Sequence, residues 1–159
     1  GHLLPSHEPV ALGDEVCALF EFYEALADDR GVTLHVSGDA TVMGDRLMLR
    51  RALNNLLSNA LRYTPPAGTV EVRIDEREGE VRLAVQNNGK PIPSEVMQRL
   101  FERFFRAEQD RSHSSGEGEG AGLGLAITKA IVQAHGGRIQ AHAYSEGNVF
   151  EILIPLSAE

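Results

Sequence analysis

The sequence predicts an α/β protein, a two-layer α/β sandwich in which three helices cover one face of a mixed, mostly antiparallel sheet. The expected elements run helix, strand, strand, helix, two strands, helix, loop, helix and two strands, without the regular alternation of an all-parallel sheet. The chain has 159 residues, of which 42% are hydrophobic and 24% charged, and this suits one globular domain with an ordinary core.

Two helices and two short strands are expected in the first half of the chain. Gly31 follows a run of apolar residues at helical spacing and suits a left-handed helix cap. Asp45 can cap a second helix, which carries its leucines on one face and ends before a Pro-Pro-Ala-Gly loop. These elements are a helix over 12–30, strands over 32–36 and 41–43, and a helix over 46–62.

The second half predicts two hairpins and two more helices. Apolar residues alternate in two strands joined by a turn at Gly79, and Ser94 is expected to cap the next helix. Gly136 and Gly137 end the last helix. These elements are strands around 70–74 and 81–85, a helix from Ser94 to about 105, a polar glycine-rich loop over 106–121, a helix over about 122–135, and strands over 138–144 and 148–154.

The composition excludes several classes of protein. A formal net charge of −8 opposes binding to nucleic acid or to anionic membranes, so any anion site must be built locally. No apolar run approaches the roughly 18 residues of a membrane-spanning helix. The single cysteine, Cys17, excludes an internal disulfide framework, and its place on the apolar side of a helical pattern predicts a thiol packed in the core.

A polar stripe runs along the helix over 46–62, opposite its leucines, and consists of Arg51, Asn55, Asn59 and Arg62. Asparagine costs roughly half a kcal/mol against alanine in a helix, so a purely solvated stripe would more often use Glu, Lys or Gln. Amide oxygens suit a hard cation, and arginines supply donors for an anion. The stripe alone leaves both a binding site and a solvent-facing surface open.

Asn87 follows the alternation of the strand over 81–85, which directs its amide to the buried face of the sheet. A buried amide without a partner costs roughly 1–3 kcal/mol. Its partner is either a nucleobase edge or a neighbouring backbone group in an ordinary strand-end turn, and the latter is the commoner arrangement.

Five glycines lie within nine residues and lead directly into an apolar helix: Gly116, Gly118, Gly120, Gly122 and Gly124. Closely spaced glycines let backbone N–H groups approach an anion, and a helix N-terminus favours negative charge. No Gly-Lys-Ser/Thr follows, so this is not a Walker loop, and no strand precedes it as a dinucleotide fingerprint requires. A flexible linker is the alternative.

Four segments together carry a family resemblance. They are NNLLSNALRYTP (54–65), QNNGKPI (86–92), LFERFFR (100–106) and GAGLGLAI (120–127). In order and spacing they resemble the N, G1, F and G2 boxes of the catalytic ATP-binding domain of two-component sensor histidine kinases, which has the Bergerat (GHKL) fold. The SNALRYTPPAG wording is most similar to heavy-metal and copper sensor kinases.

The resemblance implies that the chain binds ATP and Mg²⁺. Asn59 would coordinate Mg²⁺ with assistance from Asn55, and residues 106–121 would form a lid over the nucleotide that is open or disordered without it. The implied ATP-binding residues are Asn55, Asn59, Arg62, Tyr63, Asn87, Gly89, Ile92, Phe104, Arg106, Arg111, Gly120, Gly122, Leu123, Gly124 and Leu125. The domain would span 9–157, with residues 1–8 a tag remnant or a linker from an upstream dimerisation domain.

The sequence departs from the family pattern at two positions. Asn87 stands where the family has an Asp that accepts from adenine N6, and Pro91 replaces the second G1 glycine. An amide can present either its oxygen or its nitrogen, so it can meet adenine N6–H or guanine O6. We therefore predict that ATP binds, with poorer discrimination against GTP than Asp would give.

None of the six histidines lies in a helical acceptor motif, so the expected catalytic residues of phosphoryl transfer do not include an acceptor His in this chain. The resemblance implies that the acceptor lies on a dimerisation domain and that a response regulator receives the phosphoryl group. We expect a monomer for this chain and a homodimer for the full-length protein. We expect no nucleic-acid or direct membrane contact, and a cytoplasmic place within an inner-membrane sensor protein.

Three other readings stay open. Heat-shock chaperone, MutL and gyrase-type ATPases share the fold but carry a catalytic Glu where this chain has Asn55. An anti-sigma serine kinase of the same superfamily would act on a protein without a dimerisation helix. A nucleotide-binding regulatory or docking module without kinase activity is favoured by the departures at Asn87 and Pro91.

Overall fold

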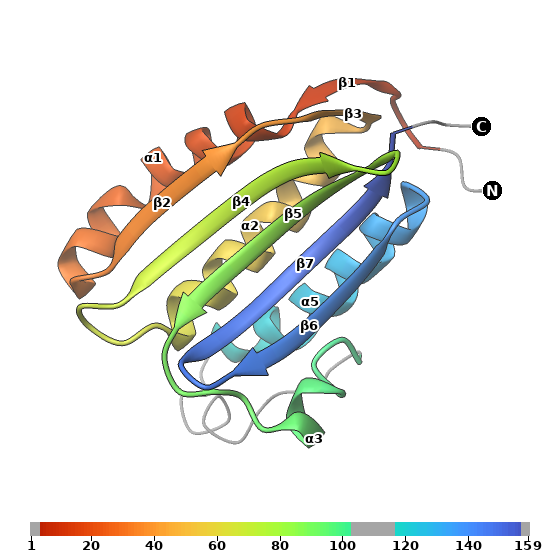
Figure 1. Ribbon diagram of the computed structural model, residues 1–159. Coiled ribbons are helices and arrows are strands. Elements are labelled where there is room, and N and C mark those ends of the chain that lie inside the picture. The colour runs from red at the N-terminus through yellow and green to blue at the C-terminus, as the bar shows by residue number, and fades with distance from the viewer. Residues whose placement is uncertain (1–3, 103–116, 157–159) are drawn as a thin grey trace.

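The computed structural model describes residues 4–102 and 117–156, with the backbone alone for 117–123. Five strands form one sheet in the order β2-β4-β5-β7-β6, in which only β2 and β4 run parallel. Three long helices cover one face of this sheet, which confirms the predicted two-layer sandwich (Figure 1). The strands of the sheet are β2 (Thr33–Gly38), β4 (Thr69–Arg77), β5 (Glu80–Asn88), β6 (Arg138–Tyr144) and β7 (Gly147–Pro155), and the three helices are α1 (Leu12–Arg30), α2 (Arg46–Tyr63) and α5 (Glu117–Ala134).

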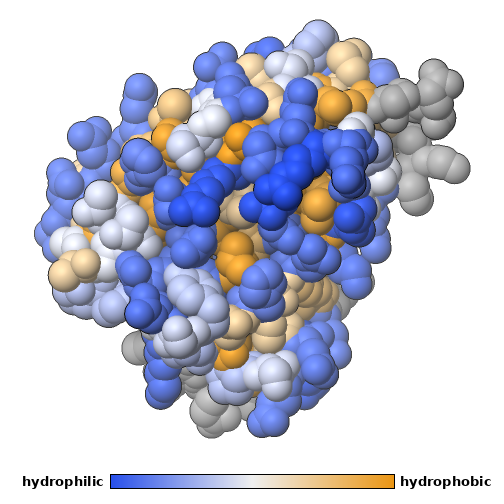
Figure 2. Space-filling model, viewed as in Figure 1, coloured by the Kyte–Doolittle hydropathy of each residue, from blue (hydrophilic) through white to orange (hydrophobic). Residues whose placement is uncertain are grey.

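The core lies between the helices and the alternate residues of the strands. Side chains of β4, β5 and β7 that share one parity are buried against the leucines of α2, as the period of two in a strand requires. These strand residues are Val70, Val72, Ile74, Val81, Leu83, Val85, Phe150, Ile152 and Ile154. Figure 2 shows the opposite face of the sheet, which is largely hydrophilic with hydrophobic patches between the polar side chains.

Two predicted helix caps and one predicted turn are confirmed. Gly31 adopts the left-handed conformation at the end of α1, with φ 73°. Asp45 accepts a hydrogen bond from the Met48 N–H at the start of α2, and this bond holds the pKa of the Asp45 carboxyl below its ordinary value. Glu78 and Gly79 both have positive φ, which matches the twist of the β4–β5 hairpin.

Cys17 is exposed, so the prediction of a core thiol is wrong. Successive helical residues are 100° apart, and the buried positions of α1 include its neighbour Val16 and the next-turn residue Leu19. Cys17 is turned one step beyond this buried side. The apolar pattern of α1 is wider than the face that the core covers. Phe22, which lies on the other flank of the buried side from Cys17, is likewise 75% exposed.

The helix predicted from Ser94 to about 105 is much shorter in the structure. The helix α3 spans Ser94–Met97, and its N-cap is Pro93, which forms no side-chain capping bond, so the predicted capping role of Ser94 is wrong. Tighter turns follow, since Arg99 N–H donates to Val96 O and Glu102 N–H donates to Arg99 O. The last residues of the predicted helix, 103–105, lie outside the described residues.

The last helix begins earlier than the sequence predicted. Residues 117–121, which we assigned to the glycine-rich loop, form the first turns of α5. Glycines lower helix propensity, so the pattern concealed this start. The rest of the predicted lid, 106–116, lies outside the described residues.

A small strand near the N-terminus was not predicted. The strand β1 (Glu8–Ala11) pairs antiparallel with β3 (Thr41–Gly44), and Ser6 N–H donates to the Asp45 carboxylate. Gly44 lies against the ring of His135, whose Nε2 accepts from the Asp45 N–H. These contacts join the start of the chain to the beginning of α2 and the end of α5.

Candidate functional site

The polar stripe of α2 meets α5. Asn55 Nδ2 donates to Gly124 O at 3.0 Å and to Thr128 Oγ1 at 3.2 Å, and the Thr128 hydroxyl itself donates to Gly124 O at 2.8 Å. Asn55 therefore fixes the position of α5 against α2. Thr128, fully buried on an apolar helix, is a site residue that the sequence analysis missed. The sequence signal that could have found Thr128 is its position four residues after Gly124, which places both on the same side of the helix.

Asn59 lies one helical turn after Asn55, on the same side of α2. Its Nδ2 is buried, and no described residue provides a hydrogen-bond partner for it. Amide oxygen and nitrogen are interchangeable in assignment, so the group can present either a donor or an acceptor to a ligand. A buried polar atom without a partner is costly unless a ligand supplies one. The amide oxygen of this residue suits a hard cation such as Mg²⁺.

Asn87 lies at the end of β5 with its side chain 2% exposed, which confirms the predicted burial. Its Nδ2 donates to the neighbouring Asn88 O at 3.0 Å. This is the strand-end backbone contact that we weighed against a nucleobase, and it uses the amide nitrogen. The orientation leaves Oδ1 as the atom to present to a ligand.

Gly89 brings the end of β5 against the end of α2. Its φ is +147°, and a Cβ at this position would lie 2.6 Å from Tyr63 O. Only glycine tolerates both the conformation and this approach. Tyr63 O and Asn87 Nδ2, from separate elements, therefore both lie close to Gly89, where the resemblance places the base of the nucleotide.

Asn148 holds the turn that follows Gly89 and was also missed. It is fully buried on β7, its Oδ1 accepts from the Ile92 N–H at 2.8 Å, and its Nδ2 donates to Lys90 O at 3.2 Å. Asn148 pairs with Asn87 in the register of the sheet. The period of two that predicted burial of Asn87 would have found Asn148 as well, because Asn148 lies two residues before Phe150 and therefore faces the same side of the sheet.

Replacing Asn148 with alanine is expected to lower the free energy of unfolding by about 1–3 kcal/mol, because two buried backbone groups lose their partner. Urea denaturation of the purified chain measures this. Ser145→Ala, an exposed change in the adjoining hairpin, is the control and should leave stability within about 0.5 kcal/mol. Equal stabilities of the two variants would contradict the anchoring role.

The remaining predicted site residues fall into four groups. Arg62 is exposed in the last turn of α2, whereas Ile92 and Leu125 are buried in the core. Gly120, Gly122 and Leu123 lie on the α5 backbone before Gly124. Outside the described residues lie Phe104, Arg106 and Arg111.

Acidic metal sites and membrane spans are not found in the described part of the chain. No group of three His, Cys, Asp or Glu side chains there could hold a metal ion. None of the helices described is long and apolar enough to cross a bilayer.

The α/β sandwich carries a buried Asn59 Nδ2 that has no partner among the described residues, and the end of α2 lies against the strand end at Gly89. Both features fit the class of ATP-binding domains that the four motifs resemble. The chain belongs to the family of histidine kinase-, DNA gyrase B- and HSP90-like ATPases, whose profile matches residues 44–158. Members of this family bind ATP, as the four motifs implied.

Comparisons with single proteins narrow the relationship to sensor kinases. The chain is similar to the sensor histidine kinase CusS of Escherichia coli strain K12, at 49% identity over 154 residues that cover 96% of this chain and 32% of CusS. This confirms the expected resemblance to heavy-metal and copper sensor kinases. The chain spans about a third of the length of the curated relatives it matches.

Solved structures give the same result. The catalytic domain of histidine kinase ThkA has a TM-score of 0.82 at 26% identity, covering 95% of this chain and 96% of that one. ThkA solved in complex with the response regulator TrrA has a TM-score of 0.77 at 25% identity, covering 95% of this chain and 42% of that one. The chain is thus similar to the catalytic domain of sensor histidine kinases.

Proposed function

We propose that the chain binds Mg²⁺–ATP and presents the γ-phosphoryl group to a histidine on a dimerisation domain, from which a response regulator receives it. The buried Nδ2 of Asn59, which has no hydrogen-bond partner among the described residues, is the observation that carries this proposal. The match to the ATPase family and the similarity to CusS and ThkA support it. The ThkA complex with its response regulator supports the same kind of partner here.

The residues of this chain contribute positioning and electrostatics, which supply most of the catalysis in phosphoryl transfer. Asn59 would hold the metal ion with assistance from Asn55, although the Asn55 Nδ2 is already bonded to α5. Arg62 would neutralise phosphate charge, and Asn87 Oδ1 would accept from the adenine amino group. Bound Mg²⁺ offsets the charge of the triphosphate.

Phosphoryl transfer is tested by incubating the chain with radiolabelled ATP and a separately produced dimerisation domain that carries its acceptor histidine. We expect label on that domain in the presence of Mg²⁺, and no label on this chain when it is incubated alone. Robust autophosphorylation of the chain alone would contradict the proposal that the acceptor is supplied from elsewhere.

A regulatory nucleotide-binding module is the second candidate, because Asn87 and Pro91 depart from the kinase pattern. The two candidates differ in phosphoryl transfer, whereas both require nucleotide binding. Thermal shift with ATP, ADP and GTP, each with and without Mg²⁺, establishes binding first. Binding without transfer to any supplied acceptor domain would favour the regulatory module.

Nucleotide preference provides a test of Asn87. Wild type is expected to prefer ATP over GTP, because the bond from Asn87 Nδ2 to Asn88 O opposes the amide flip that guanine requires. Asn87→Asp should raise this preference by about fivefold, since a charged acceptor forms the stronger bond to the adenine amino group. Titration calorimetry with both nucleotides measures the ratio.

The matched control for this titration is Asn88→Asp. Asn88 is exposed, and its Oδ1 accepts from Thr69 N–H, a bond that a carboxylate retains. This variant adds the same charge one residue away and should leave the ATP-to-GTP preference unchanged. Discrimination by wild type equal to or better than that of Asn87→Asp would reject the assigned role.

A further inference from the structure

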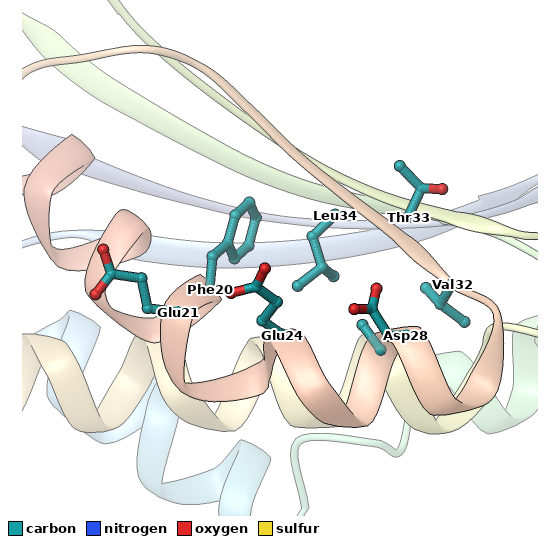
Figure 3. Close-up of a pocket in the computed structure, with 8 residues that line it drawn as sticks. Phe20, Glu21, Glu24, Asp28, Val32, Thr33 and Leu34 are labelled. Atoms are coloured by element: carbon teal, nitrogen blue, oxygen red, sulfur yellow. The ribbon is translucent and has the colours of Figure 1, made fainter.

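A groove of about 370 Å³ lies between α1 and the start of β2, on the far side of α2 from α5. We call it the acidic groove. Its apolar part is formed by Phe20, Val32 and Leu34, and its rim carries Glu21, Glu24 and Asp28. Figure 3 shows the side chains of Phe20, Glu24 and Leu34 directed into the same space. No residue of the proposed nucleotide site contributes to it.

The rim charges of the groove are uncompensated. Glu21, Glu24 and Asp28 are exposed, and none of them forms an ion pair with a cation in the part of the chain that the structure describes. Elsewhere acidic residues of the described chain do have such partners, for example Glu15 with Arg50 at 2.7 Å. Three like charges beside an apolar floor therefore complement a ligand that is both basic and apolar.

The strand beside the groove is an edge of the sheet. β2 pairs with β4 along one side, and no described strand pairs with its other side. An edge strand presents unpaired backbone N–H and C=O groups to an added strand, and proteins usually protect such edges. Here the groove lies directly beneath the free edge, so an added strand would find side-chain contacts as well as hydrogen bonds.

We propose that the acidic groove and the free edge of β2 together bind an extended segment of a partner protein that carries both apolar and basic residues on the side that faces the groove. Alternate side chains of a strand point to opposite sides, so one set would enter the groove. Apolar groups of that set would contact Phe20 and Leu34, while lysine or arginine side chains of the same set would reach the Glu24 and Asp28 carboxylates.

The negative charge of the acidic groove indicates which class of partner it binds. Nucleic acid and anionic membranes are repelled by the rim and by the net charge of −8. A second copy of this chain would bring the same acidic rim, and its own β2, with the sequence Thr-Leu-His-Val-Ser-Gly, carries neither lysine nor arginine. A basic segment of a different protein is the complementary partner.

The test uses a fluorescein-labelled synthetic peptide of about eight residues, long enough to pair with all of β2. Valine and lysine take turns at every second position, so that both face the groove, and serine fills the positions between them. Fluorescence anisotropy should show saturable binding that weakens as salt is raised. Amide chemical shifts should move along Thr33–Gly38. A peptide with glutamate in place of lysine, and a peptide methylated on alternate backbone nitrogens, should both fail to bind, because one lacks the charge and the other lacks the strand hydrogen bonds.

Charge reversal in the chain completes the test. Glu24→Lys and Asp28→Lys should each weaken peptide binding about tenfold. Asp29→Lys, an exposed reversal on the same helix that does not line the groove, should weaken it less than about twofold. Retained Mg²⁺–ATP binding shows that each variant is folded.

Four outcomes would overturn the proposal. The first is no binding of the valine–lysine peptide, and the second is equal weakening by Asp29→Lys and Glu24→Lys, which would indicate non-specific charge attraction. The third is unimpaired binding of the methylated peptide, which would remove strand addition to β2. Self-association of the chain that blocks the peptide would assign the edge to a second copy instead.

Discussion

Asn59→Ala should weaken the binding of Mg²⁺–ATP at least about tenfold, while binding of ATP in EDTA should change much less. The reason is the Asn59 amide on α2, whose Nδ2 is buried without a partner among the described residues. Alanine removes the oxygen that would coordinate the metal ion, and with it the coupling between metal and nucleotide. Titration calorimetry with and without Mg²⁺ measures both affinities.

Asn54→Ala is the matched control on the same helix. Asn54 Oδ1 accepts from Tyr23 OH at 2.6 Å, on the side of α2 that meets α1 and not α5. Its removal affects the α1–α2 contact and should leave nucleotide affinity within about twofold. If the two variants lose Mg²⁺-dependent affinity equally, Asn59 has no special role and the proposed site is wrong.

The alternation of residues predicted most of the sheet, because burial on one face imposes a period of two that is visible in the sequence. Asn87 is the clearest case, since a polar residue in an apolar parity was correctly placed on the buried face. The contact between α2 and α5 could not be predicted in the same way. The bond from Asn55 to Gly124 joins residues 69 positions apart, and no local pattern reports it.

Errors arose where local preference and tertiary packing disagree. Cys17 belongs to an apolar helix pattern that is wider than the covered face, so its exposure depends on how far the neighbouring elements extend. The strand β1 is four residues long and contains Pro9, which is a weak strand signal. Its existence depends on pairing with β3, which is a tertiary contact.

Phe150→Ala is expected to have the largest effect on stability, lowering the free energy of unfolding by about 3–5 kcal/mol. Phe150 is the largest side chain among those nearly fully buried, and it lies on β7 between β5 and β6 in the middle of the core. Ala141, which pairs with Phe150 from the neighbouring strand β6, is too small to fill the cavity. Urea denaturation with an unchanged m-value would measure this loss directly.

The aromatic partner of Phe150 connects this core to the segment after α3. The rings of Phe101 and Phe150 pack edge to face, with centroids 6.1 Å apart and planes at 72°. Because Phe101 is only partly buried, Phe101→Ala should cost about 1–2 kcal/mol, clearly less than Phe150→Ala. The double variant should cost less than the sum of the two, since the ring contact is lost only once. Full additivity would show that the two rings do not stabilise each other, and the segment around Phe101 would then depend on Leu100 and Met97 for its place against the sheet.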